Sequence, residues 1–208
     1  MTKILLTRHG HVEGIHPERF RGRQQLELTP RGRKEAAAVA ARIAGAWRPA
    51  KIYTSPMARC VATGAAIAQS TGAPAEICAD LNDIDYGAWQ FKTLDAAKAD
   101  DPVLYAAWLA TPELIRFPNG EALQDLAARA ANVLRFVLAR HAGDTIVLVG
   151  HDSVNRALLM QCLGMPLSAY RRIAQEPCCL NEIDIDGGTI RVVRINETHH
   201  LDGLAPAQ

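Results

Sequence analysis

The chain has 208 residues, 49% of them hydrophobic, which is enough to bury a sizeable core, so we expect one domain over residues 1–208. Lys and Arg number 23 against 22 for Asp and Glu, and this balance excludes an overall basic field for nucleic acid or an acidic membrane. Aromatic residues make up only 5%, and a core of Ala, Leu, Val and Ile is typical of helices packed on a sheet.

Two features of the sequence indicate in which cellular compartment the protein works: its apolar segments and its cysteines. Residues 1–8 hold too short an apolar stretch for a signal peptide, and no run approaches the roughly 18 apolar residues of a membrane span. The five cysteines are odd in number and form no Cys-x-x-Cys pair, which favours reduced structural thiols over zinc. We therefore expect a cytoplasmic protein with no nucleic-acid or membrane partner.

Strands and helices alternate in the first third of the chain. Lys3 to Thr7 predicts a buried strand, which ends at a loop that begins Arg8-His9-Gly10. A cap residue followed by proline predicts a helix from Thr29 to Trp47 and another from Ser55 to about Thr71. Lys51 to Thr54, between these helices, predicts a second strand.

The middle of the chain is broken into short pieces before a long helix. Ala75 to Cys78 predicts a third strand, and residues 81–120 then hold Asp, Pro and Gly breaks with short helical stretches around 93–110. We expect this segment to be an excursion over the sheet. Glu121 to His141 carries one apolar stripe at three-and-four spacing and predicts the longest helix.

A second strand with a histidine at its end follows. Thr145 to Val149 is an apolar run typical of a central parallel strand, and Gly150-His151-Asp152 precedes a helix from about Ser153. Asn181 to Ile185 and Thr189 to Ile195 alternate apolar with polar residues and predict a closing hairpin. The tail, residues 197–208, is expected to be loose.

This alternation predicts an α/β fold, a three-layer α/β/α sandwich with a mostly parallel central sheet. Ligands of such sheets bind beyond the carboxyl ends of the strands, where the sequence places Arg8, His9 and His151, with Arg59 in the first turns of a helix. Guanidinium groups match phosphate oxygens, and a neutral imidazole can attack phosphorus while a second, protonated one stabilises charge. These residues predict a phosphate site.

Several motifs occur in a characteristic order. They are Leu6-Thr7-Arg8-His9-Gly10, Leu28-Thr29-Pro30-Arg31-Gly32, Thr54-Ser55-Pro56-Met57-Ala58-Arg59, Tyr86-Gly87-Ala88-Trp89, Pro118-Asn119-Gly120-Glu121 with Arg129, and Val147-Leu148-Val149-Gly150-His151. This order resembles the landmarks of the histidine phosphatase superfamily, which includes the cofactor-dependent phosphoglycerate mutases. The match covers nearly residues 3–195 and implies a phosphoglycerate mutase-like fold.

The resemblance also implies a reaction and roles for residues. His9 is then the nucleophile that becomes phosphohistidine, Arg8 and Arg59 hold the phosphoryl group, and His151 stabilises the transition state. The expected enzyme is a histidine acid-type phosphatase that acts on a small phosphorylated substrate with neither metal nor other cofactor. The substrate stays unspecified, and a homodimer is compatible with the sequence.

The loop after His9 departs from the family pattern, which reads Arg-His-Gly-Glu and has an asparagine seven residues after the arginine. His11 and Ile15 stand at these positions. The missing asparagine removes one phosphate donor, which Arg19, Arg21 or Arg23 could replace, although the three arginines fit a solvated loop equally well. We favour Arg19 for substrate binding, because it matches a family arginine.

Two aspartates compete for the role of proton donor. Asp83 stands where the family has a glutamate, two residues after Leu81, but is one methylene shorter. Asp152 adjoins His151, which resembles the His-Asp pair of the acid phosphatase and phytase branch, where the aspartate protonates the leaving group. We favour Asp83 slightly and keep Asp152 as the alternative.

Three other functions stay open. A phosphoglycerate mutase would transfer the group to a second substrate, but such mutases keep the glutamate and asparagine that this chain lacks. A catalytically silent protein would bind a phosphorylated ligand without turnover. A metal hydrolase would use His9-Gly10-His11 as a His-x-His pair, although no further ligands are evident.

Overall fold

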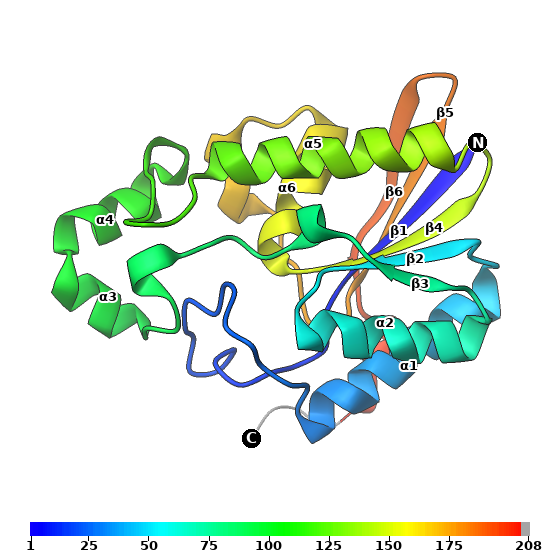
Figure 1. The fold of residues 1–208 in the computed structure, drawn as a ribbon, viewed down its shortest axis with the longest axis horizontal. Coiled ribbons are helices and arrows are strands. Elements are labelled where there is room, and N and C mark those ends of the chain that lie inside the picture. Colours follow the sequence, from blue (N-terminus) through cyan, green and yellow to red (C-terminus); the bar gives the residue numbers. More distant parts are fainter. Residues whose placement is uncertain (205–208) are drawn as a thin grey trace.

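The computed structural model describes residues 1–204, which form one mixed sheet between two layers of helices (Figure 1). Its strands are β1 (Thr2–Arg8), β2 (Lys51–Thr54), β3 (Ala75–Ile77), β4 (Thr145–Gly150), β5 (Leu180–Asp186) and β6 (Thr189–Glu197). They lie in the order β3-β2-β4-β1-β5-β6, with β1 to β4 parallel to one another and β5 antiparallel to both of its neighbours, β1 and β6. The predicted α/β sandwich with a mostly parallel sheet is confirmed.

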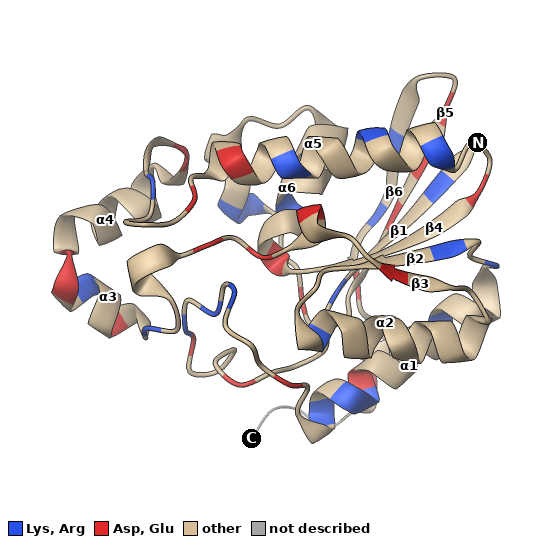
Figure 2. Ribbon diagram, in the orientation of Figure 1, with Lys and Arg blue, Asp and Glu red and all other residues tan. Residues whose placement is uncertain are grey.

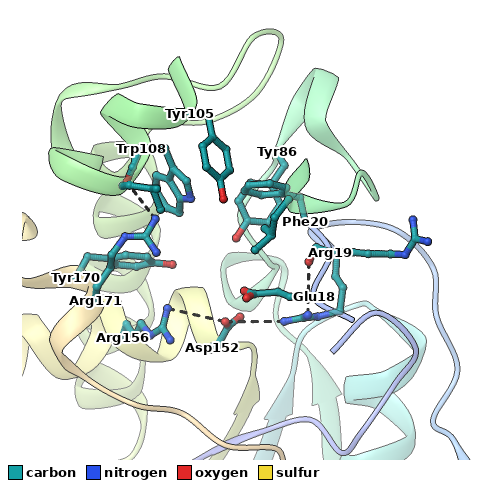
Figure 3. A pocket seen from close by; sticks show the side chains of 13 residues that line it. Glu18, Arg19, Phe20, Tyr86, Tyr105, Trp108, Asp152, Arg156, Tyr170 and Arg171 are labelled. Atoms are coloured by element: carbon teal, nitrogen blue, oxygen red, sulfur yellow. Dashed lines mark hydrogen bonds and ion pairs between the residues drawn. The ribbon is translucent and has the colours of Figure 1, made fainter. Parts of the chain in front are cut away.

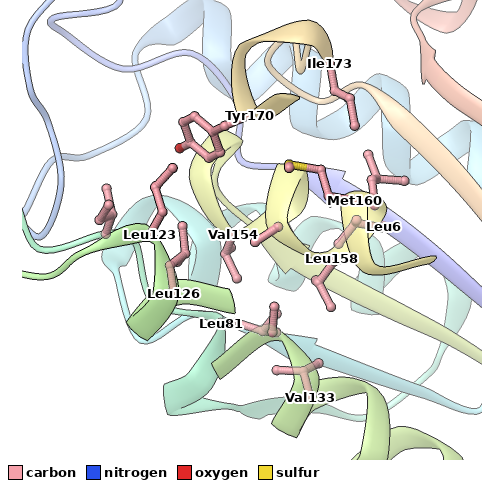
Figure 4. Packing of buried hydrophobic residues seen from close by; sticks show 14 of the residues in the cluster. Leu6, Leu81, Leu123, Leu126, Val133, Val154, Leu158, Met160, Tyr170 and Ile173 are labelled. Carbon is pink, nitrogen blue, oxygen red and sulfur yellow. The ribbon is translucent and has the colours of Figure 1, made fainter. Parts of the chain in front are cut away.

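Each face of the sheet carries one pair of long helices. Helices α1 (Pro30–Ala46) and α2 (Ala58–Thr71) cover one face, and α5 (Leu123–Arg140) and α6 (Asp152–Leu163) cover the other (Figure 1). Side chains of a strand point alternately to the two faces, so on β1 Leu5 packs toward α1 and α2 while Leu6 packs toward α5 and α6. Figure 4 shows Leu6 in this second cluster with Leu126, Val133 and Leu158.

Helix α2 begins later than the sequence indicates. Ser55-Pro56 was expected to open it, but the first helical residue is Ala58, and Met57 at the cap makes no side-chain hydrogen bond. The Ser55 hydroxyl lies 2.8 Å from Nε2 of His151. That hydroxyl also accepts from Met57 N at 3.3 Å, one residue before the helix begins.

The middle excursion stands beyond the carboxyl ends of the parallel strands (Figure 1). It holds α3 (Leu94–Asp100) and α4 (Pro102–Ala110), and α4 is capped by Asp101, which accepts from Leu104 N at 2.9 Å. Aromatic rings anchor it, because Phe20 from the loop after β1 packs 5.0 Å from both Tyr86 and Trp89. The excursion is therefore tied to the loop that carries the first histidine.

The end of the chain is more ordered than predicted. Strand β6 continues to Glu197, and His199–Leu201 form a 3-10 turn. A ring nitrogen of His200 lies 2.9 Å from the carbonyl oxygen of Cys178, so this part of the expected loose tail packs on the domain. Residues 205–208 lie outside the described part. Within residues 1–204, no helix combines the length and apolarity that crossing a membrane requires.

The packing of α5 gives a stability prediction. Leu126 is completely buried between α5 and the sheet, so Leu126→Ala should lower the free energy of unfolding by about 2–5 kcal/mol, through lost burial and the cavity left behind. Leu138 on the same helix is 37% exposed, and Leu138→Ala should cost clearly less. Chemical denaturation of both variants measures the difference, and equal losses would contradict the packing described.

Candidate active site

The ends of two neighbouring strands bring the two histidines together. Arg8 at the end of β1 is in register with Gly150 at the end of β4, and His9 N donates to Gly150 O at 3.0 Å. The rings of His9 and His151 consequently lie with centroids 5.1 Å apart, and both side chains are buried. The parallel register therefore produces the pairing.

His9 is held in one tautomer and kept neutral. Its Nδ1 lies 2.7 Å from the carbonyl oxygen of Gly10, so Nδ1–H donates there and Nε2 carries the free lone pair. Burial lowers its pKa well below the usual histidine value, and the nearby charges of Arg59 and Arg8 lower it further. A neutral imidazole with a free Nε2 is the form that can act as a nucleophile.

The loop containing His9 approaches α1 too closely for any side chain at Gly10. A Cβ there would lie 2.4 Å from the carbonyl oxygen of Gly32, and a Cβ at Gly32 would lie 2.1 Å from the carbonyl oxygen of His11. The loop is also fixed by His11, whose N donates to Glu35 Oε2 at 2.7 Å and whose Nδ1 lies 3.0 Å from Thr29 Oγ1. His11 thus anchors the loop on α1.

Arg59 is fully buried at the start of α2 and links three segments. Its guanidinium donates to the carbonyl oxygens of Gly22 at 2.6 Å and Gln24 at 2.8 Å, and to Asp83 Oδ2 at 3.1 Å. Its Nε also donates to Nδ1 of His151 at 3.3 Å. Arg59 therefore lies at the junction of the loop after β1, the excursion and the second histidine.

His151 is also neutral in this arrangement. Burial lowers its pKa well below the usual value, and the charges of Arg59 and Arg8 add to the effect. Because Arg59 donates to Nδ1, the other nitrogen carries the proton, and Nε2–H faces the Ser55 hydroxyl at 2.8 Å. A negative group placed beside the ring would favour its protonation.

Arg8 contributes a buried donor that has no protein partner. Its side chain donates from a terminal nitrogen to Gln175 O at 2.6 Å, whereas Nε has no hydrogen-bond partner within residues 1–204. Leaving such a charged donor unsatisfied is costly, so its presence points to an anion that it would bind. Arg8 and Arg59 thus both lie close enough to His9 for their charges to lower its pKa.

The two candidate acids differ in protonation. Asp83 is buried, accepts from Ile84 N at 2.9 Å and faces Arg59; burial raises its pKa, and the charge of Asp152 raises it further. Burial also opposes ionisation of Asp152, but the charges of Arg8, Arg156 and Arg21 outweigh it and lower its pKa. Asp83 therefore retains its proton more readily than Asp152, which is ionised at neutral pH.

The segment that carries Asp83 is fixed by a charged cluster. Arg129 donates to the carbonyl oxygens of Asp80 and Asn82, both at 2.9 Å, and pairs with Glu121 at 2.9 Å. Arg23 pairs with the same Glu121 at 2.8 Å. Although Arg129 is a charged residue of the long helix α5, it faces these inward carbonyls. Its place beside the Pro118 to Glu121 motif was the available signal.

Of the three loop arginines, Arg21 lies nearest the histidines. The Arg19 guanidinium stacks 4.9 Å from the Phe91 ring and donates to Phe91 O at 3.1 Å, so it lies at Phe91, although Arg19 also lines the cavity described below (Figure 3). Arg21 is buried, donates to Gly14 O at 2.6 Å and lies 3.9 Å from Asp152 Oδ2. The predicted Arg19 is thus not brought together with Arg8, whereas Arg21 is.

A cavity of about 190 Å³ opens next to Asp152 (Figure 3). Its lining includes Glu18, Phe20, Arg21, Tyr86, Tyr105, Trp108, Asp152, Arg156, Tyr170 and Arg171. An adjoining cavity of about 210 Å³ shares Glu18, Arg21, Asp152 and Arg156 with it and reaches Arg8. The part of a substrate beyond the phosphoryl group therefore has room next to the histidines.

The described residues gather no cluster of metal ligands, and basic and acidic residues are nearly equal in number. Over residues 1–204, no three His, Cys, Asp or Glu side chains come together as a metal site would need. Figure 2 shows basic and acidic positions interspersed along the ribbon, which agrees with the near balance of 23 basic and 22 acidic residues. The positive charge at the histidines is therefore local.

Comparison with known proteins agrees with this geometry. The model of the histidine phosphatase superfamily, branch 1, matches residues 4–198. Phosphoserine phosphatase 1 of Hydrogenobacter thermophilus is 26% identical over 97% of this chain and 95% of its own, and a metal-independent phosphoserine phosphatase of Arabidopsis thaliana is 28% identical over 77% and 68%. The structure of Bacillus stearothermophilus YhfR superposes with a TM-score of 0.91 at 28% identity, covering 97% of this chain and 100% of that one.

The unpaired donor of Arg8 gives a binding prediction. Arg8→Lys keeps the positive charge but loses the paired N–H donors of the guanidinium. The Kd for inorganic phosphate, measured by calorimetry, should therefore rise at least about tenfold, or about 1.4 kcal/mol. Arg135 is exposed on α5, and Arg135→Lys is the matched control that should bind phosphate like the wild type. Unchanged binding in the Arg8 variant would show that Arg8 does not hold phosphate.

Proposed function

The chain belongs to the histidine phosphatase superfamily, and on that basis we propose that it hydrolyses a phosphate monoester through a phosphohistidine on His9. The observation that carries this proposal is the buried, neutral His9, whose Nε2 lone pair is free while Arg8 and Arg59 lie close to it. The names of relatives, phosphoserine phosphatases among them, support the same class of reaction.

The first step transfers the phosphoryl group to the enzyme. The Nε2 lone pair of His9 forms a bond to phosphorus as the bond from phosphorus to the ester oxygen breaks. The departing oxygen takes a proton from Asp83, whose raised pKa keeps that proton available. Donors on Arg8 and Arg59 neutralise the equatorial oxygens, and His151, which takes a proton from solvent as the anion binds and returns it when inorganic phosphate leaves, adds positive charge beside them.

The second step returns His9 to its starting state. Asp83, now ionised, takes a proton from a water molecule whose oxygen attacks phosphorus from the side that the alcohol left. The bond from phosphorus to Nε2 breaks, and inorganic phosphate leaves the cationic pocket. Asp83 is then protonated and His9 neutral, so protons and charges balance over the cycle.

Asp152 has a different role in this proposal. It is ionised between Arg21 and Arg156, each 3.9 Å from its Oδ2, so it has no proton to give at neutral pH. Its charge offsets these arginines at the edge of the pocket. The comparison with the His-Asp pair of the acid phosphatase branch therefore does not extend to its function.

Transfer to a second substrate, as in a mutase, is the alternative to hydrolysis. We favour water as the acceptor, because the chain lacks the glutamate and asparagine that mutases of this family keep, with His11 and Ile15 in their places. We further propose that the enzyme works in the cytoplasm on a small phosphorylated substrate without a metal. Phosphoserine is one such substrate to test, given the names of two relatives.

The covalent intermediate gives a direct test. His9→Ala removes the nucleophile, so turnover of p-nitrophenyl phosphate should fall by at least about 10³-fold while the circular dichroism spectrum stays the same. Rapid acid-free quenching of the wild type with labelled substrate should trap an acid-labile phosphoryl group on His9. His199→Ala, at an exposed histidine that lines neither cavity, is the control and should keep the activity of the wild type. Substantial activity of the His9 variant would refute the mechanism.

The proton donor is tested by the leaving group. An alkyl oxygen needs protonation far more than a nitrophenyl oxygen, so Asp83→Asn should lower kcat about 10²-fold on alkyl phosphates and clearly less on p-nitrophenyl phosphate. Asp152→Asn should affect both substrates alike. The opposite pattern, with the leaving-group dependence in the Asp152 variant, would assign the acid to Asp152.

A further inference from the structure

Ser153 carries a fully buried hydroxyl that the reaction steps above do not use. It lies in the first turn of α6, two residues after His151, and its Oγ lies 2.5 Å from Oδ1 of Asp83. The two residues are 70 positions apart in the chain, so only the folded protein brings them together. The candidate proton donor on the excursion is therefore held by the helix that follows the second histidine.

The two carboxyl oxygens of Asp83 have different surroundings. Oδ1 faces the Ser153 hydroxyl and also accepts from Ile84 N at 2.9 Å. Oδ2 accepts from a terminal nitrogen of Arg59 at 3.1 Å and lies 3.4 Å from Nδ1 of His151. Oδ2 is therefore the oxygen on the side of the histidines, and Oδ1 is the oxygen that the excursion and α6 hold.

The contacts of Ser153 show which way its hydroxyl proton is directed. Ile84 N also lies 3.2 Å from the Ser153 Oγ, which accepts there with one of its two lone pairs. The hydroxyl proton is then available to Oδ1 of Asp83. An oxygen toward which two donors point is a poor position for a further proton, so a protonated Asp83 carries its proton on Oδ2.

Titratable and charged groups face Asp83 from every element packed against it. They are Arg59 and Cys60 on α2, Arg21 and Arg23 in the loop after β1, His151 after β4, Asp152 on α6, Arg129 on α5, and Tyr86 and Tyr170. Burial raises the pKa of Asp83 and the charge of Asp152 adds to this, whereas the charge of Arg59 and the Ser153 hydrogen bond oppose it. Removing the Ser153 hydroxyl should therefore raise this pKa further.

We propose that Ser153 is a positioning residue for the proton donor, because its hydroxyl donates to Oδ1 of Asp83 and so leaves the transferable proton on Oδ2. The inference rests on the proposed phosphatase function and deepens it. In the first step the Oδ2–H bond breaks as the departing ester oxygen gains the proton. In the second step Oδ2 regains a proton from the attacking water. Ser153 keeps its own proton throughout.

The test compares two leaving groups in Ser153→Ala. Its kcat on glycerol 3-phosphate should fall about tenfold, while its kcat on p-nitrophenyl phosphate changes less than about twofold, because a nitrophenyl oxygen needs little protonation. The basic limb of kcat/KM for glycerol 3-phosphate should also move to higher pH. Activity is lost as pH rises through the pKa of the acid, and that pKa is higher without the serine donor.

A second variant shows whether Ser153 acts through Asp83. Asp83→Asn has no proton to give, so adding Ser153→Ala to it should cost less than about a further twofold on glycerol 3-phosphate. Thr71→Val is the matched control, because it removes a half-buried hydroxyl that donates to Ile67 O at 2.8 Å at the far end of α2. It should keep both activities. The ratio of two substrates cancels any uniform loss of active enzyme.

Two results would overturn the inference. One is an equal loss on both esters in Ser153→Ala, and the other is a full additional loss when Ser153→Ala is combined with Asp83→Asn. If the wild type does not hydrolyse p-nitrophenyl phosphate, the proposed function fails instead.

In that case, or if glycerol 3-phosphate is not turned over, a titration tests the contact itself. The pKa of Asp83 is followed by carbon-13 NMR of the aspartate carboxyl groups and assigned with Asp83→Asn. It should be higher in Ser153→Ala than in the wild type and unchanged in Thr71→Val. A pKa of Asp83 that is the same with and without the serine hydroxyl would overturn the inference.

Discussion

The site depends above all on the buried guanidinium of Arg59. A fully buried guanidinium is tolerated only when hydrogen bonds surround it, and Arg59 obtains these from Gly22 O, Gln24 O and Asp83. These partners come from the loop after β1 and from the excursion, so satisfying one side chain fixes both segments against α2. The same group donates to His151 and so orients the second ring as well.

The protonation of the site follows from this burial. His9 and His151 are buried beside Arg8 and Arg59, so both rings stay neutral, whereas Asp83, more deeply buried than Asp152, tends to keep its proton. An incoming phosphate reverses this balance, because its negative charge offsets the arginines and favours a protonated His151. The Arg8 Nε donor, which has no protein partner within residues 1–204, therefore favours binding of an anion.

Local sequence patterns were sufficient to predict the framework. Continuous apolar runs gave β1 and β4, and parallel strands in register necessarily place His9 next to His151. The direction of side chains in irregular segments was not predictable in this way. The turn of Arg19 toward Phe91 depends on a ring 72 positions away, and Arg129 faces inward because of carbonyls in the excursion. Ser55, too, faces His151, a contact that only the folded chain creates.

The chemistry and the selectivity of the site have different structural origins. His9, His151 and the arginines lie at strand ends or on the buried face at the start of α2, where the sheet fixes them. The neighbouring cavity is instead assembled from the loop after β1, α4 of the excursion, α6 and the segment around Tyr170. Its walls can change without moving a strand, because the excursion is held by aromatic contacts and by the Glu121 cluster rather than by the sheet. A family built in this way can keep one phosphoryl-transfer reaction while the shape of the leaving-group cavity varies.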